Sequence, residues 1–189
     1  NKNIFKSSIG NYNLQSYQFT SYLNKKNTDA LIYLNDIQTN GFRNHSRLKQ
    51  KAFNLKLRHR FKDKSLLNFQ FNYTDSPMAQ DSGGLTKEET LLEWDMARQR
   101  NIDYDTYEKI SQLKFGFNWE KKLRKKMKLN FFSFYSNRDF YGKLPFEFGG
   151  IIDLDRYYQG LGSSLIYNDI NENLAHQIQF GIEYYSQND

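Results

Sequence analysis

The segment Ser65–Asp75 reads SLLNFQFNYTD, and its side chains alternate strictly in polarity. Every second residue from Leu67 to Tyr73 is apolar, and the residues between them are amides or a hydroxyl. A period of two residues is typical of a β-strand whose two faces meet different surroundings. One face of this strand suits a hydrocarbon phase, whereas the other face suits water.

The same alternation recurs along the chain and predicts about nine strands. Neither Pro77 nor Pro145 falls inside an alternating segment, as expected where every backbone N–H is needed for pairing. The clearest further segments are 53–61, 113–120 and 178–185, and weaker ones are 17–23, 30–34, 127–135, 161–167 and 3–9.

Composition narrows the class of protein. Aromatic residues make up 17% of the 189 residues, which is too many for a disordered segment. Mean hydropathy is −0.85, and no window approaches the roughly 18 apolar residues that a spanning helix needs. A helical membrane protein is therefore excluded, whereas a β-barrel keeps a low mean hydropathy because lipid-facing and lumen-facing residues alternate. The absence of cysteine excludes disulfides and thiolate chemistry.

The predicted connections alternate between short and long. In an up-and-down sheet, this places the short turns at one end and the long loops at the other, as in outer-membrane barrels. The short polar turns are predicted at 24–28, 62–65, 120–126 and 169–173, and the long segments at 36–47, 75–109 and 138–157.

Aromatic residues mark both ends of the apolar segments. Amphipathic rings prefer the headgroup level of a membrane, so the sequence predicts two interfacial girdles. The members next to the short turns are Phe61, Trp119 and Tyr167, and those expected at the opposite strand ends are Tyr73, Tyr135 and Tyr184. Ordinary core aromatics of a soluble sandwich are the alternative.

These patterns predict an all-β, antiparallel, up-and-down transmembrane β-barrel with long extracellular loops. Lipid cannot satisfy a free backbone N–H, so such a wall must close on itself. Nine strands do not give the even number that bacterial single-chain barrels have, so we expect residues 1–189 to be part of a longer chain. At about 21 residues per strand, the wall would supply about nine strands of a 22-stranded barrel.

Three stretches resemble a known family in their order and spacing. They are SSIGNYNLQSYQFTSYLN (7–24), NGFRNHSRL (40–48) and SPMAQDSGGLTKEE (76–89). Together they resemble the early barrel of TonB-dependent outer-membrane receptors, in which a Gly-Asn or Gly-Ser turn, a DGFR.HS-like segment and a PGGLT.EE-like loop follow one another. Asn40 stands here where Asp is commoner in that family, and Ser82 stands where Pro is commoner.

The resemblance implies a function and a set of partners. It implies TonB-coupled uptake of a scarce solute, closest to a ferric chelate such as a siderophore, across the bacterial outer membrane. The plug and the region that meets the TonB–ExbB–ExbD complex would lie outside this chain, and no cofactor beyond the transported chelate is implied.

The long loops hold the candidate binding residues. Positive side chains at the mouth would attract anionic chelates, and the alternative for each is a solvated loop charge or a strand-end cap. Thr86 and Glu89 form a capping box, which predicts a helix of about three turns with Leu91, Leu92 and Trp94 available for packing. The candidate substrate-binding residues are Arg43, His45, Arg47, Arg98, Arg100 and Tyr141.

Other functions receive less support from the residues. No catalytic constellation is present, so we expect no enzyme. His45, His59 and His176 fall at different heights and predict no metal site, and His59 falls in the lipid-facing register. The basic clusters separate strands and predict solvated turns rather than a nucleic-acid groove. A passive porin, and less directly a soluble polyanion-binding β protein, stay open as alternatives.

Overall fold

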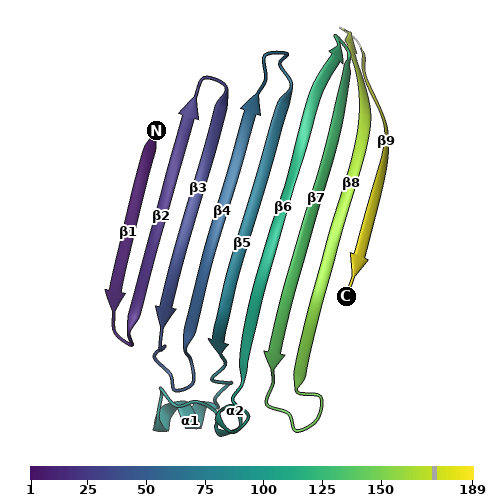
Figure 1. The fold of residues 1–189 in the computed structure, drawn as a ribbon. Coiled ribbons are helices and arrows are strands. Elements are labelled where there is room, and N and C mark those ends of the chain that lie inside the picture. Colours follow the sequence, from purple (N-terminus) through teal and green to yellow (C-terminus); the bar gives the residue numbers. More distant parts are fainter. Residues whose placement is uncertain (172–173) are drawn as a thin grey trace.

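In a computed structural model, which describes residues 1–171 and 174–189, the chain forms one antiparallel sheet whose nine strands follow the order of the sequence (Figure 1). The strands are β1 (Lys2–Gly10), β2 (Leu14–Lys25), β3 (Thr28–Thr39), β4 (Leu48–Arg60), β5 (Leu66–Gln80), β6 (Tyr107–Arg124), β7 (Met127–Lys143), β8 (Ile151–Asn171) and β9 (Leu174–Asn188). Two short helices, α1 (Lys87–Leu92) and α2 (Gln99–Asp103), lie between β5 and β6. All nine predicted strands are confirmed, and the sheet is not closed within the described residues.

The pairing register aligns the apolar positions of neighbouring strands. Phe69 of β5 lies opposite Leu57 of β4 on one side and Phe117 of β6 on the other. Cross-strand pairs of apolar or aromatic side chains stabilise a sheet. The alternation of single strands therefore becomes a continuous apolar face.

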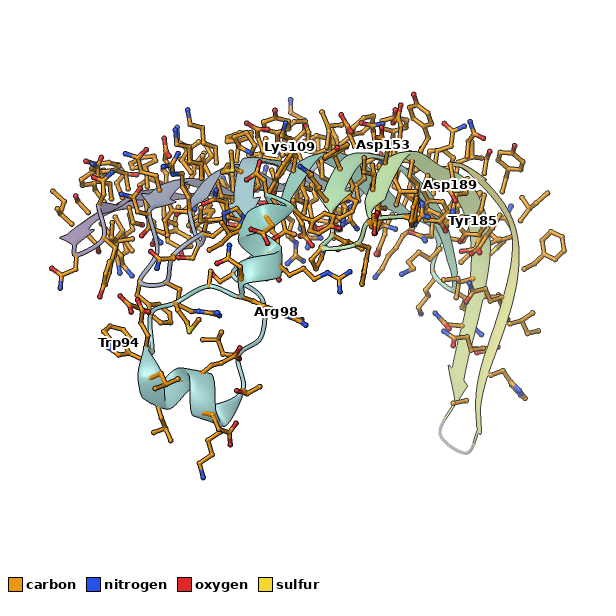
Figure 2. The ribbon with its side chains drawn as sticks, turned by 90° about the horizontal axis from the view of Figure 1, so that it is seen from below. Trp94, Arg98, Lys109, Asp153, Tyr185 and Asp189 are labelled. Carbon is orange, nitrogen blue, oxygen red and sulfur yellow. The ribbon has the colours of Figure 1, made fainter. Side chains whose placement is uncertain are left out.

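The apolar face is the convex one. Figure 2 shows the sheet curved along its width, with Lys109 and Asp153 on the convex side and Tyr185 and Asp189 on the concave side. Because side chains alternate, Phe115 and Phe117 share the convex face with Lys109, which lies on the same strand. The prediction that the apolar rows point outwards is confirmed.

No second layer covers either face of the sheet. Ala97 is the only apolar residue of the described chain that is fully buried, at 3% exposure. Phe180 and Ile182 of β9 are 79% and 75% exposed. A soluble sandwich would bury such side chains between two sheets, so its expected aromatic core is absent from the part of the chain that the structure describes.

Connections of different length gather at opposite ends of the sheet (Figure 1). At one end, here the turn end, lie residues 26–27, 61–65 and 125–126. The predicted turns at 120–126 and 169–173 are corrected in part, because β6 runs to Arg124 and β8 to Asn171, and residues 172–173 lie outside the described residues. At the other end, here the loop end, lie residues 11–13, 40–47, 81–106 and 144–150.

The loops are shorter than the sequence predicts. The segments 36–39, 75–80, 107–109, 138–143 and 151–157 were expected in loops but belong to β3, β5, β6, β7 and β8. Charged residues such as Asp36, Asp139 and Asp153 interrupt the convex apolar rows in these stretches, so they lack the alternation that marks the apolar part of each strand. The wall thus continues beyond its apolar band at the loop end.

The first hairpin departs from the predicted alternation of connections. Residues 11–13 form a short turn at the loop end, with Tyr12 and Asn13 at φ values of 58° and 55°. Left-handed residues are typical of tight hairpin turns because their backbone matches the twist of the strands. The helices have six and five residues, and among the described residues none is long and apolar enough to cross a membrane.

Candidate functional site

Polar side chains cover most of the concave face and are joined in amide chains across strands. Asn118 of β6 donates a hydrogen bond to Asn130 of β7 at 2.7 Å, and Asn72 of β5 donates to Asn54 of β4. Gln70 in turn donates to Asn72 at 2.6 Å. These networks fix a polar surface along the concave face of the sheet.

Basic side chains interrupt the amide rows without acidic neighbours. One row of paired residues runs through Lys56, Gln70 and Gly116, and the next runs through Asn54, Asn72 and Lys114. Neither row contains an acidic residue on any described strand from β2 to β9. A concave surface with one sign of charge raises the local concentration of oppositely charged solutes, so these two rows favour anions, although the next row includes Asp29 and Glu183.

An aromatic cluster occupies the concave face where β7, β8 and β9 meet. The ring centroids of Phe134 and Tyr158 lie 5.0 Å apart, and those of Phe134 and Tyr185 lie 6.1 Å apart. Phe132 joins through Tyr185 at 6.4 Å. Sequence analysis missed this cluster, although the run FFSFY (131–135) places rings on both faces of one strand.

Glycine makes room for these rings. A Cβ atom on Gly160 would come within 2.6 Å of both Phe134 and Tyr185, and one on Gly162 would meet Phe132 at 2.6 Å. Only a residue without a side chain lets the rings lie flat against the sheet. The alternation of Gly160 and Gly162 was the sequence signal for this patch.

At the loop end, Arg43 joins two loops that are distant in sequence. Its guanidinium donates hydrogen bonds to the carbonyl oxygens of Met96 (3.0 Å), Gly83 (2.8 Å) and Ser82 (3.2 Å). The segment 40–47 is thereby held against the segment 81–106. Because these acceptors are backbone atoms of the other loop, the main role of the Arg43 side chain is to hold the two loops together.

His45 makes a second connection between the same loops. Its Nε2 lies 2.7 Å from the carbonyl oxygen of Thr106, and Ser82 Oγ donates to the His45 carbonyl at 3.1 Å. Asp105 lies 4.0 Å from the ring nitrogen. The imidazole is only 10% exposed, so it too is directed into the loop cluster rather than towards solvent.

A buried polar node shapes the base of the long loop. Asn101 and Thr106 are 1% and 0% exposed. Asn101 Nδ2 donates to the Asp81 carbonyl (3.1 Å), to the Asp81 carboxylate (3.0 Å) and to Thr106 Oγ1 (3.1 Å). Sequence reasoning missed this node, because Asp81 is 20 positions from Asn101 and 25 positions from Thr106 in the sequence.

The capping box is confirmed, but the helix it begins is shorter than predicted. Glu89 N donates to Thr86 Oγ1 (3.2 Å), and Thr86 N donates to Glu89 Oε2 (2.7 Å). The predicted three turns divide into α1 and α2, with the segment 93–98 between them. Leu91 and Leu92 remain 78% and 86% exposed, while Trp94 stacks on Phe42 at 6.0 Å.

The remaining candidate residues do not form one cluster. Arg47 and Arg98 are exposed at the loop end, and Arg98 lies with Trp94 on the concave side (Figure 2). The guanidinium of Arg100 lies 5.8 Å from the ring centroid of Tyr104 and 5.7 Å from that of Phe146. It bridges the segment 81–106 to the segment 144–150 through cation–π contacts.

Tyr141 is not on a loop, and its placement there was wrong. It lies in β7, opposite Lys109 and Asp153, on the convex face. Its ring stacks on Tyr107 at 5.7 Å. The polar strand end 138–143 lacks the apolar alternation that would have identified it as a strand.

The expected girdle aromatics lie on the convex face, but most are not at strand ends. Tyr73, Tyr135 and Tyr184 were placed at ends, yet β5 continues to Gln80, β7 to Lys143 and β9 to Asn188. Trp119 and Tyr167 likewise precede the ends of β6 and β8, because both strands extend past their apolar part. His59 lies opposite Leu67 on the convex face, in the register predicted for it.

The fold is a curved, single-layer antiparallel sheet of the kind that forms the wall of large outer-membrane receptor barrels. Two outer-membrane receptors are among the solved structures that this chain resembles. The ferric citrate transporter FecA in its unliganded form has a TM-score of 0.73 and 16% identity, and the match covers 98% of this chain and 28% of FecA. The ferric-catecholate import receptor Fiu from E. coli K12, in its open form, has a TM-score of 0.65 and 9% identity, and the match covers 96% of this chain and 33% of Fiu.

The comparison therefore concerns the fold. The matched part of this chain corresponds to 28% of the length of FecA and 33% of the length of Fiu. No family model matches the sequence.

Proposed function

We propose that residues 1–189 form part of the 22-stranded barrel of a TonB-dependent outer-membrane receptor. The receptor imports a scarce anionic solute, most directly a ferric chelate of the siderophore type. Support comes from the resemblance of the segments 7–24, 40–48 and 76–89, and from the fold shared with FecA and Fiu. A plug and the contact with the TonB–ExbB–ExbD complex belong to the parts of such a receptor outside this chain.

The observation that carries the proposal is the difference between the two faces of the wall. The convex face presents rows of Leu, Phe and Tyr to the surroundings, while the concave face presents amides with Lys56, Arg58 and Lys114. A wall with this arrangement separates lipid outside from a hydrated passage inside. Lys56 and Lys114 take part in no ion pair among the described residues, so their positive charge favours a passage for anions.

The loop cluster forms the outer part of the proposed pathway. The segment 81–106 lies on the concave side of the sheet, where it would cover the mouth (Figure 2). We propose Arg47, Arg98 and Arg100 as the positive groups that a chelate meets first. Arg43 and His45 keep the cluster in place, and Tyr141 stands outside the proposed set because it lies on the convex face.

Uptake by cells that produce the full-length receptor tests the proposal. The double substitution Lys56→Glu with Lys114→Glu reverses charge on the concave face, and we expect uptake of radiolabelled ferric citrate or ferric catecholate to fall roughly tenfold or more. Lys51→Glu is the matched control, because Lys51 pairs with Asp75 in the convex register. Equal uptake by the parent and the double variant contradicts the assignment of the concave face as the pathway.

Three further measurements separate the gated receptor from the other classes. Uptake must stop in cells that lack TonB. A purified full-length protein that gives a steady open conductance in planar bilayers would instead be a passive porin. A protein that stays monomeric in plain buffer without detergent would contradict the membrane assignment altogether.

A further inference from the structure

At the turn end, a hollow opens on the convex side of the wall beside the β4–β5 turn. Its lining includes His59, Phe61, Lys62, Asp63, Ser65 and Trp119. Aromatic rings form one part of this turn-end hollow, and a lysine and the backbone of a tight turn form the other. Neither the transport pathway nor the loop cluster uses any of these residues.

The hollow has a fixed shape because its turn is held by several hydrogen bonds. Ser65 is 2% exposed, and its N and Oγ donate to Asp63 Oδ1 at 3.0 and 2.6 Å. The ring of His59 is held by Thr28 Oγ1 at 2.7 Å and meets Phe61 edge-on at 4.7 Å. A ligand would therefore find the aromatic wall already in place.

The turn end carries a surplus of positive charge. Lys121, Lys126 and Lys128 are paired with Asp63 (2.9 Å), Asp169 (2.5 Å) and Glu120 (3.1 Å). Within the described chain, the ion pairs include none of the other basic residues at this end, which are Lys25, Lys26, Arg60, Lys62, Lys64, Lys122, Arg124 and Lys125. A partner with negative charge is the complement of this surface.

We propose that the turn-end hollow binds the headgroup of an anionic phospholipid. The phosphate lies near Lys62, and the acyl chains descend over Phe61 and Trp119 onto the apolar convex face. This site rests on the proposed function, because it requires the convex face to lie in a bilayer. A phospholipid fits better than a nucleic acid, because one side of the hollow is aromatic and continues into rows of Leu and Phe.

Asp63 sets the strength of this binding. Hydrogen bonds from Ser65, and then the ammonium group of Lys121, hold the pKa of its carboxyl well below the usual range. Asp63 therefore keeps its negative charge and neutralises Lys121, which leaves Arg60 and Lys62 as the cations of the hollow. Replacing Asp63 by Asn keeps an acceptor for Ser65 but removes the charge that opposes a phosphate.

Quenching of Trp119 fluorescence by brominated lipids tests the site in the full-length protein. The protein is reconstituted in phosphatidylethanolamine vesicles that contain an equal mole fraction of either brominated phosphatidylglycerol or brominated phosphatidylethanolamine. The difference in emission between the parent and Trp119→Phe isolates the signal of Trp119. We expect stronger quenching by brominated phosphatidylglycerol than by brominated phosphatidylethanolamine. The ratio of their association constants at the site should be roughly five and should decrease at high salt.

Three variants sharpen the outcome. Lys62→Glu should bring the ratio of the two lipids to about unity, while Asp63→Asn should raise it by roughly fivefold. Lys109→Ala, on the same face at the loop end, should leave the ratio unchanged. Equal quenching of the parent by both lipids overturns the phospholipid site, whereas the absence of quenching by either lipid overturns the proposed membrane location itself.

Discussion

The guanidinium of Arg43 donates a hydrogen bond of 2.8 Å to the carbonyl oxygen of Gly83, 40 positions further along the chain. Two further hydrogen bonds from the same side chain reach Ser82 and Met96. A hydrogen bond from a charged donor contributes roughly 1.5–3 kcal/mol, and a planar guanidinium holds several acceptors at once. The position of the segment 81–106 therefore depends on a residue in a different loop.

Arg43→Ala should release the segment 81–106 without unfolding the sheet. Three carbonyl oxygens lose their donor, so we expect amide hydrogen exchange in this segment to become at least tenfold faster. Hydrogen exchange with mass spectrometry measures it, with peptides from β5 and β6 as internal references. Arg47→Ala is the matched control, because Arg47 is exposed and its side chain makes no hydrogen bond among those of the described residues. Similar exchange in both variants would show that Arg43 does not hold the loops.

The apolar parts of the strands could be predicted from the sequence, but their polar ends could not. Alternation such as that of Leu67 to Tyr73 identifies each strand, because one face must be apolar and the other wet. The polar ends 75–80 and 138–143 lack that contrast, so their strand structure depends on pairing with neighbours that a sequence pattern does not reveal. For the same reason Tyr141 was assigned to a loop.

The loop cluster was predictable only in part. The capping box of Thr86 and Glu89 is local, and its residue types at that spacing are sufficient to recognise it. The partners of Arg43 are backbone carbonyls about 40 to 53 positions away, and any residue type can supply them. Hence the sequence indicated a positive side chain at position 43 without indicating what it binds.

Gly160→Ala should destabilise the wall. The new methyl group would lie 2.6 Å from both Phe134 and Tyr185, whose rings approach from the strands on either side. Moving two packed rings is expected to cost roughly 1–3 kcal/mol of the free energy of unfolding. Gly84→Ala is the control, because nothing lies within 4 Å of a Cβ atom there.

Equilibrium unfolding of the full-length protein in detergent measures this difference. Gly160→Ala combined with Phe134→Leu should recover part of the loss, since the smaller side chain relieves the crowding. If the single variant is as stable as Gly84→Ala, the aromatic cluster does not pack against Gly160.

Asp63 should make stability depend on pH in the acid range. Its folded-state pKa is lowered by Ser65 first and Lys121 next, relative to an ordinary value of 3.8. A carboxyl with a lowered pKa stabilises the folded state above its unfolded pKa and loses this contribution as pH falls through the folded value. The unfolding temperature of Asp63→Asn should therefore lie below that of the parent at neutral pH, and the gap should close below about pH 4.

Thermal unfolding followed by circular dichroism over this pH range tests the effect. Glu88→Gln serves as the reference, because Glu88 is exposed and takes part in none of the described ion pairs. A gap that persists unchanged at the lowest pH would mean that the asparagine side chain alters packing rather than charge.

A pair of neighbouring substitutions tests the two-faced wall directly. Phe69 and Gln70 adjoin in β5, but their side chains point to the convex and the concave face. A lysine on the lipid side of a barrel near mid-bilayer costs roughly 2–4 kcal/mol, so Phe69→Lys should destabilise the full-length protein in phospholipid vesicles by about that amount. Gln70→Lys adds the same charge to the concave face, where it lies opposite Lys56 and loses the hydrogen bond to Asn72, and should cost no more than about 1 kcal/mol. Guanidinium unfolding from vesicles gives both values, and equal losses would contradict the assignment of lipid to the convex face.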